Sequence, residues 1–299
     1  GWLNDAFATD IARLRVSGAL QLELVFAATP GETRQAVYPR LEMQLAPQSQ
    51  LVLVERHLGT TGADGTISAA VQIHAGAGSQ VQHLRWQALG DDAQLLDTVQ
   101  IALDRDARYA LTQLTLGART ARTSLRAALY GPGADLCLRA VAVAAGRRTL
   151  DHSLLVDHVA PHTTSAQVFR AIARAPAHIA CRSRVEIAAS ARHAGSEQSL
   201  KGLLEGSGAE IDLRPQLEIH TDEVRANHGA TTGALDPAMQ FYLLSRGLDE
   251  ATARALLEWA FLEDALARID PPALRRAAEE AAAAALGSVV ARHLLGMAA

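Results

Sequence analysis

Short segments of alternating apolar and polar residues, separated by turns, fill the middle of the chain and constrain its fold more than any other feature. Sixteen of the 22 glycines lie between Gly59 and Gly233, and only three follow. Residues that alternate with a period of two place one side of a strand inward and the other outward. The segments are 51–54, 67–74, 81–89, 95–103, 109–116, 124–129, 136–143, 154–159, 179–187 and 211–219. They predict a series of short β-strands, with turns at glycines from Gly76 to Gly206.

Many short strands in succession are typical of a β-sandwich, a barrel or a β-helix. A stretch of about 180 residues contains no second type of element that would close another fold. The inward positions are often Ala, Ser or Val, which suit the stacked coils of a narrow solenoid. No strict repeat period is visible, so the pattern alone places a β-helix only slightly ahead of a sandwich.

The chain changes to a helical pattern at Asp236, and residues 236–299 are expected to form a C-terminal helical domain. Asp236 precedes Pro237, as an N-cap precedes proline at the first helical position, and Gly247 is expected to end this helix. Asp249 and Asp270 are expected to begin two more helices. The predicted buried faces are Met239, Tyr242, Leu243 and Leu244, then Ala253, Leu256, Leu257, Ala260 and Phe261, then Leu286, Val289 and Val290.

The start of the chain is assigned to a partly helical N-terminal remnant, residues 1–30, followed by the β-helix core over residues 31–235. Residues 2–14 are expected to form a short amphipathic helix. The chain opens on Gly1 rather than on methionine, which fits a trimmed N-terminus.

Composition limits the environment and the partners of the chain. Hydrophobic residues make up 49% of its 299 residues and aromatic residues 4%, which predicts an aliphatic core. The net charge of −4 argues against a nucleic-acid partner. No apolar run is long enough to cross a membrane, and no signal peptide is recognisable. Cys137 and Cys181 lack metal-site spacing and are too few for a disulfide framework, which favours a cytoplasmic protein.

One ordered motif carries a resemblance to a known family. Residues 214–233 read RPQLEIHTDEVRANHGATTG, and residues 241–247 read FYLLSRG. The first motif resembles the SufD signature (K/R)-P-x-L-E-I-x-A-D-D-V-x-C-x-H-G-A-T-x-G, and the second resembles the helix that follows it. The sister family SufB has H-E-A-T-x-S-K at this place, so Gly229 and Gly233 favour SufD. The resemblance is strong over about 50 residues, including Leu203 and Leu204. In the rest of the chain only the general pattern of short strands and turns is similar.

The resemblance implies a right-handed parallel β-helix followed by a C-terminal helical domain. It also implies a non-catalytic scaffold subunit of a cytoplasmic SufB–SufC–SufD complex that assembles iron–sulfur clusters. SufC is the ATPase of such complexes, and SufB and SufD pair through the ends of their β-helices, where a transient cluster forms. A homodimer is expected when the chain is alone. The implied SufC-docking residues are Phe241, Tyr242, Arg246, Gly247 and Leu256.

His228 is the sharpest candidate for a cluster contact. An imidazole nitrogen suits iron, and histidine can replace a thiolate on an exposed iron. One histidine cannot hold a cluster, so His228 fits only as one ligand of a site shared with SufB; the alternative is a structural turn histidine. The family cysteine two residues earlier is Ala226 here, and the family's Asn-Leu-Leu begins with Gly202. Because of these departures, the ligands of a cluster are expected to come from His228 and from the partner.

Three further groups each have a functional and a structural interpretation. His158 and His162 have the spacing of a metal pair, but Pro161 between them opposes a helix. Cys181 lies near two arginines, as in an activated thiol, but a buried cysteine on a strand is commoner. Glu218 and Asp222 have the spacing of paired carboxylates on one strand face, but they also fit a row of solvent-exposed side chains on the outer face. Nucleotide-binding, hydrolase-elbow and zinc-protease motifs are absent from the sequence.

Two other functions remain open at this stage. A β-helix polysaccharide lyase or hydrolase is the alternative from another class, although such an enzyme needs an aromatic and acidic groove, and aromatic residues are few. The third possibility is a purely structural adaptor in which His228 is inert.

Overall fold

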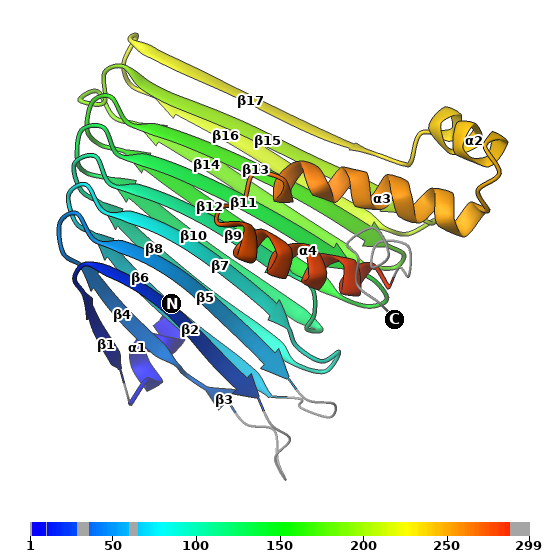
Figure 1. Cartoon of the computed structure of the whole chain (residues 1–299), viewed down its shortest axis with the longest axis horizontal. Helices are drawn as coiled ribbons and strands as arrows, with labels where there is room; N and C mark the ends of the chain where they lie inside the picture. The colour runs from blue at the N-terminus through cyan, green and yellow to red at the C-terminus, as the bar shows by residue number, and fades with distance from the viewer. Residues whose placement is uncertain (1, 10, 29–35, 60–64, 288–299) are drawn as a thin grey trace.

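The computed structural model describes residues 2–9, 11–28, 36–59 and 65–287, and shows two parallel sheets with two C-terminal helices along the outer face of one of them (Figure 1). Sheet A follows the order β1-β4-β6-β8-β10-β12-β14-β16, with β3 beside β6, and sheet B the order β17-β15-β13-β11-β9-β7-β5-β2. Sheet A consists of β1 (Ala12–Val16), β3 (Ala36–Val37), β4 (Arg40–Leu45), β6 (Thr66–Ala75), β8 (Gln94–Leu103), β10 (Thr120–Leu129), β12 (Thr149–His158), β14 (His178–Ile187) and β16 (Glu210–Ile219). Sheet B consists of β2 (Ala19–Ala28), β5 (Gln50–Gly59), β7 (Gln80–Ala88), β9 (Arg108–Thr115), β11 (Asp135–Ala144), β13 (Thr164–Arg174), β15 (Ala194–Glu205) and β17 (Val224–Gly233).

Parallel pairing between strands two apart in the chain makes the molecule a solenoid. From β4 onward the chain passes from one sheet to the other after each strand, so each coil contributes one strand to each sheet. The coil length varies: Thr120 pairs with Gln94, a separation of 26 residues, and Glu210 pairs with His178, a separation of 32. The predicted parallel β-helix is confirmed, and the sandwich is excluded.

Stacked tight turns form one corner of the solenoid. In the six turns that run from the β4–β5 turn to the β14–β15 turn, one residue has a φ between 56° and 74°, namely Gln48, Gly78, Asp106, Gly133, His162 and His193. The amide of each donates to a carbonyl in the turn of the following coil, over 2.6–3.4 Å. The next residue in each turn is small and buried: Ser49, Ser79, Ala107, Ala134, Thr163 and Ala194. Only glycine fits at position 131, because a Cβ atom there would collide with the backbone of Asp104 and Arg105.

Two apolar cores hold the molecule together. The first fills the lumen between the sheets and is mostly Leu, Ile, Val and Ala, as the low aromatic content predicts. The second lies on the outer face of sheet B, where α3 (Glu250–Leu266) and α4 (Pro272–Leu286) pack. Leu262 and Leu266 of α3 contact this face together with Ile172 of β13. These two helices therefore lie along the side of the solenoid rather than over its end (Figure 1).

The helix ends were predicted better than the helix faces. The side chains of Asp236 and Asp249 accept hydrogen bonds from the amides of Ala238 and Thr252, so both N-caps are confirmed. Pro271 rather than Asp270 caps α4, without a side-chain bond. The predicted buried face of α2 (Pro237–Ser245) is wrong, because none of its residues is buried. In α3 only Ala253 was assigned correctly among the buried residues Ala253, Ala255, Glu258, Trp259, Leu262, Ala265 and Leu266. Val289 and Val290 lie outside the described residues.

The N-terminal segment enters the solenoid earlier than expected. The helix α1 (Trp2–Phe7) is followed by β1, so the predicted helix over residues 2–14 is correct only in its first half. Asn4 joins α1 to sheet A by donating to the carbonyls of Pro39 at 3.0 Å and Ser68 at 2.5 Å. Because β1 and β2 pair within the two sheets, the solenoid begins before residue 31.

Candidate functional site

The C-terminal end of the solenoid is open. Strands β16 and β17 stand at the ends of their sheets, and among the described residues no strand pairs with their outer edges (Figure 1). Inward side chains here are only partly buried against the lumenal core; they include Leu213, Leu217, Val224 and Ala226. Unpaired strand edges around an apolar mouth are a ready surface for another chain.

His228 lies at this mouth, on the lumen side of β17. It pairs in register with Gln198 of β15, which is 2% exposed inside the lumen. Val224 and Ala226 pack against the lumenal core, so strand alternation places His228 on the same side. His228 is nevertheless exposed, because β17 is the last strand of its sheet. It belongs to a strand, so the interpretation as a turn histidine is wrong.

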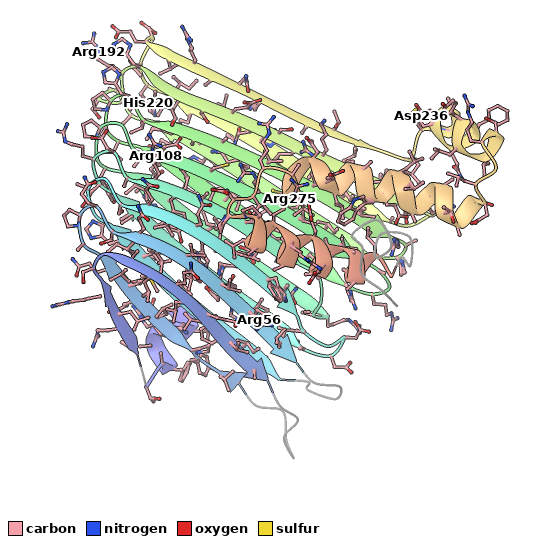
Figure 2. The ribbon with its side chains drawn as sticks, viewed as in Figure 1. Arg56, Arg108, Arg192, His220, Asp236 and Arg275 are labelled. Carbon is pink, nitrogen blue, oxygen red and sulfur yellow. The ribbon has the colours of Figure 1, made fainter. Side chains whose placement is uncertain are left out.

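A second exposed surface lies beyond β17, on α2. Its large apolar side chains are exposed: Met239 by 52%, Phe241 by 72%, Tyr242 by 53% and Leu244 by 38%. The Arg246 guanidinium lies 5.2 Å from the centre of the Tyr242 ring. Figure 2 shows Asp236, at the start of α2, far along β17 from Arg192 and His220. Large apolar side chains exposed together on one helix are typical of a surface that contacts another protein.

The remaining docking candidates flank this helix. Gly247 has a φ of +89° and follows the end of α2. Leu256 lies on α3, where it is half-buried. The structure therefore brings Tyr242 and the C-cap residue Arg246 together at the end of α2, and places Leu256 on the neighbouring helix.

Comparison with known proteins agrees with this geometry. The family model "SUF system FeS cluster assembly, SufBD core domain" matches residues 26–261. The chain belongs to the SufBD family.

Several relatives are assembly proteins by name. A SufBD family iron–sulfur cluster assembly protein of Synechocystis is 29% identical over 281 residues, which cover 89% of this chain and 62% of that protein. The iron–sulfur cluster assembly protein SufD of Escherichia coli is 24% identical over 247 residues, covering 83% and 58%. A SufBD family protein of Mycobacterium leprae is 29% identical over 257 residues, covering 83% and 64%. The chain thus spans about three fifths of the length of these relatives.

The other histidine candidates of this SufBD chain do not form a metal pair. His158 is buried, and its Nδ1 and Nε2 atoms lie 2.8 Å from the Thr163 hydroxyl and 2.7 Å from the Ser165 hydroxyl. Burial lowers the pKa of His158 to about 4, which keeps the ring neutral near pH 7. His162 lies at the corner and stacks on His193, with 4.9 Å between ring centres.

The two cysteines are structural in their setting. Cys181 is buried in the lumen, and burial raises the pKa of its thiol well above the usual value. Burial also raises the pKa of the Cys137 thiol. Neither cysteine has the lowered pKa of a reactive thiol, so the interpretation of Cys181 as an activated thiol is not supported.

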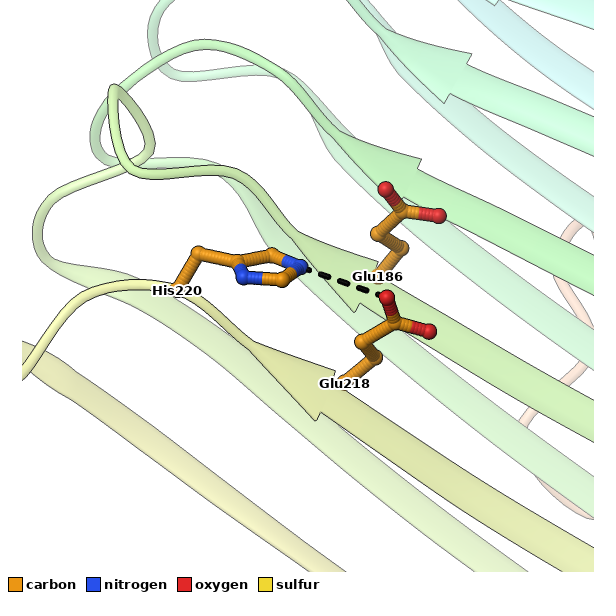
Figure 3. A group of neighbouring side chains, drawn as sticks. All are labelled: Glu186, Glu218 and His220. Carbon is orange, nitrogen blue, oxygen red and sulfur yellow. Dashed lines mark ion pairs between the residues drawn. The ribbon is translucent and has the colours of Figure 1, made fainter.

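One metal-like group occurs in the described part of the chain, on the outer face of sheet A. Donor atoms of Glu186, Glu218 and His220 all lie within 4.8 Å of one another (Figure 3). Arg184 binds the carboxylates of Glu186 at 2.9 Å and Glu218 at 2.7 Å. Since the Arg184 guanidinium already binds both acids and His220 lies 3.4 Å from Glu218, this group is an ion-pair network. Asp222 lies in the bend after β16 and shares no strand face with Glu218.

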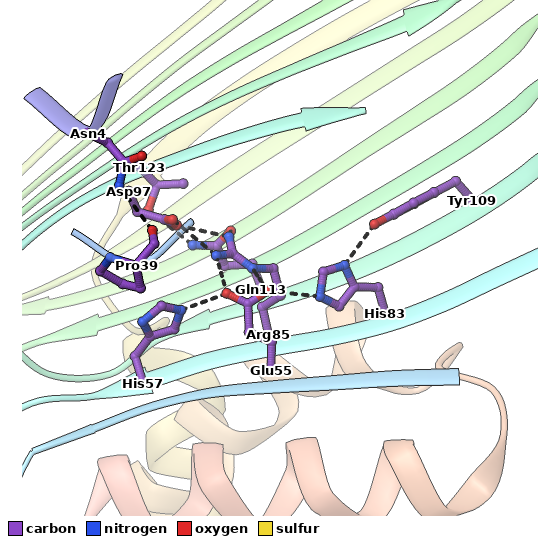
Figure 4. Close-up of polar contacts among 10 residues, drawn as sticks. All are labelled: Asn4, Pro39, Glu55, His57, His83, Arg85, Asp97, Tyr109, Gln113 and Thr123. Atoms are coloured by element: carbon purple, nitrogen blue, oxygen red, sulfur yellow. Dashed lines mark hydrogen bonds and ion pairs between the residues drawn. The ribbon is translucent and has the colours of Figure 1, made fainter. Parts of the chain in front are cut away.

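A buried charged cluster inside the lumen was missed by the sequence analysis (Figure 4). The Arg85 guanidinium binds Glu55 at 2.6 Å and Asp97 at 2.9 Å, and the imidazole of His57 lies 2.7 Å from Glu55. Burial alone would raise the pKa of Glu55, but Arg85, His57 and His83 hold it well below its usual value. All these groups are within the solenoid, so the cluster is a structural element. The detectable signal was polar residues at inward positions of predicted strands.

The groove on the outer face of sheet A offers little support for a polysaccharide enzyme. An open groove of about 640 Å³ crosses the outer face of sheet A. Its lining includes one tyrosine, Tyr130, no tryptophan or phenylalanine, and one carboxylate, Glu42, which Arg13 binds at 2.9 Å. Separately, none of the helices in the described ranges is both long and apolar enough to cross a bilayer.

Proposed function

We propose that the chain is a SufD-type scaffold subunit of a cytoplasmic SufB–SufC–SufD complex for iron–sulfur cluster assembly. In this proposal the open end formed by β16 and β17 pairs with SufB. The observation that carries the proposal is His228, exposed at the mouth between two unpaired strand edges. The matching family model and the SufD relatives support the same assignment.

The chemistry of the open end suits a shared and transient cluster. A single imidazole provides one ligand, and Ala226 provides none where the family signature has cysteine. The other ligands must therefore come from the partner, and no stably bound cluster is expected on the isolated chain. ATP hydrolysis is assigned to SufC, since this sequence has no phosphate-binding glycine loop.

Anaerobic co-expression with SufB and SufC tests the role of His228. We expect His228→Ala to leave the size of the complex unchanged and to lower its iron and sulfide content at least threefold. His220→Ala is the matched control, because His220 is also an exposed histidine near this end but follows β16 at the outer face of sheet A. Unchanged iron and sulfide in His228→Ala would instead assign the chain a purely mechanical adaptor role.

The proposed SufC dock is tested separately, on α2. Phe241→Asp places a charge on an apolar side chain that is 72% exposed, so its effect on folding should be small. We expect the variant to retain SufB and to lose SufC in a pull-down experiment. Tyr130→Asp is the control, an exposed aromatic side chain on the face of sheet A. Equal SufC recovery with native chain and Phe241→Asp would place the dock elsewhere.

A further inference from the structure

Gln198 is a buried amide whose orientation is fixed by its contacts. Its Nε2 atom donates across the lumen to the backbone carbonyl of Ser183 at 2.9 Å and to the Ser183 hydroxyl at 2.8 Å. A carbonyl can only accept, so the nitrogen end of the amide must face Ser183. The Oε1 atom is thereby placed on the other side of the amide. It is buried and has no hydrogen-bond partner among the described residues.

The neighbour of Gln198 toward the open end is His228. The two residues pair in parallel register on β15 and β17 and lie on the same, lumen-facing side. Neighbouring strands of a sheet are about 4.8 Å apart, which is within reach of a glutamine oxygen and an imidazole nitrogen. A neutral imidazole carries one N–H donor and one lone-pair nitrogen.

We propose that Gln198 is the positioning residue of His228. In this arrangement the exposed His228 ring turns from its position in the structure toward the lumen, and one of its N–H groups donates to the buried Oε1 atom, which selects a single tautomer and fixes the ring. The lone pair of the other nitrogen then points out of the open end. A histidine that binds a metal commonly donates its other ring N–H to a carbonyl or carboxylate in this way.

This turn of the ring and the hydrogen bond that it forms do not depend on the proposed function; only their consequence, presentation of a ligand nitrogen to iron at the junction, rests on it. The chain contains a matched control in Gln167, which is 1% exposed and pairs with Gln198 on β13. Both polar atoms of its amide also lack partners among the described residues. Gln167 therefore has the same residue type, burial and face, but lies one strand further from His228.

Nitrogen-15 NMR of the isolated chain, labelled at histidine and recorded in alkaline buffer, measures the tautomer ratio of His228. We expect one tautomer to dominate in the native chain. Gln198→Leu should reduce this preference about fivefold, which corresponds to one neutral hydrogen bond of about 1 kcal/mol. Gln167→Leu should leave the ratio unchanged. Gln198→Met is a second variant of similar shape, for use if Gln198→Leu does not fold.

A ratio that is equal in native chain, Gln198→Leu and Gln198→Met would overturn the proposal, as would an equal effect of Gln167→Leu. The two hypotheses fail in different experiments. A tautomer ratio that responds to Gln198, combined with cluster content that ignores His228→Ala, keeps the positioning role and rejects the proposed cluster contact. A tautomer ratio that does not respond to Gln198, combined with cluster content that falls in His228→Ala, keeps the proposed cluster contact and rejects the positioning role of Gln198.

Discussion

Single residues inside the lumen differ sharply in what the sequence reveals about them. His228 is recognisable because it lies in a contiguous motif, whereas its lumen-facing position follows only from its pairing with Gln198. Arg85 and its partner Glu55 are 30 residues apart, and Asp97 is 12 residues from Arg85. Such a cluster depends on the register of three strands and on which face of each turns inward. The alternating pattern alone determines neither the register of these strands nor the face of each that turns inward, so these contacts could not be predicted.

The buried cluster should make Arg85 important for stability. Arg85→Met leaves Glu55 and Asp97 inside the lumen without their cation, and the expected loss in the free energy of unfolding is about 3–5 kcal/mol. Chemical denaturation followed by circular dichroism measures this loss. Arg13→Met is the matched control: its side chain is 68% exposed, and its ion pair with Glu42 should contribute less than about 1 kcal/mol. Similar losses in the two variants would contradict the structural role of Arg85.

Strands were predictable as elements, and helix faces were not. Alternation located most strands from β5 to β16, but it missed β13 and β15, whose outward positions are partly apolar. The outer face of sheet B is itself apolar because α3 and α4 cover it, and this weakens the period-two pattern. The face of α3 was misassigned for a related reason. The stripe through which α3 packs on sheet B includes Trp259 and the acidic residue Glu258. A search for apolar positions does not select an acidic residue as buried.

Glu258 makes the attachment of α3 dependent on pH. Arg174 binds Glu258 at 2.6 Å and Glu205 at 2.9 Å, which joins α3 to the ends of β13 and β15. Burial and the nearby Glu205 raise the pKa of Glu258 to about 8 from a usual 4.5, although Arg174 opposes this. The folded state thus keeps a proton that the unfolded chain releases. The free energy of unfolding should therefore fall as pH rises from about 4.5 to about 8.

Unfolding curves across this pH range, for native chain and Glu258→Gln, measure the effect. The variant cannot release the proton, so its stability should vary less with pH, and the difference between the two proteins should grow in the variant's favour toward pH 8. Glu280→Gln serves as a control, since Glu280 lies on α4 in an exposed pair with Arg276. Parallel pH profiles for native chain and Glu258→Gln would show that Glu258 is ionised throughout the range.

For the whole molecule, the repeat was present in the sequence but hidden by its variable length. Six coils share a turn in which a residue with positive φ precedes a small buried residue, as in Gln48-Ser49, Gly78-Ser79 and His162-Thr163. The residue types at the positive-φ position vary, and paired residues are 26 to 32 positions apart, so no fixed period appears. The location of the helices was not predictable from helix patterns, which do not specify which surface a helix covers. Their position on the side of sheet B leaves the end at β16 and β17 open.

This open end should control self-association of the isolated chain. Ala230 pairs with Leu200 on the lumen side of β17 and is exposed, so Ala230→Glu places a charge at the apolar mouth without filling the core. We expect the native chain to dimerise, and the variant to raise the dimer dissociation constant at least tenfold, or about 1.4 kcal/mol. Sedimentation equilibrium measures both constants. Gln100→Glu, which adds the same charge on the outer face of β8, should behave as the native chain does. A native chain that stays monomeric at high concentration, or a dimer unaffected by Ala230→Glu, would show that this end does not mediate self-association.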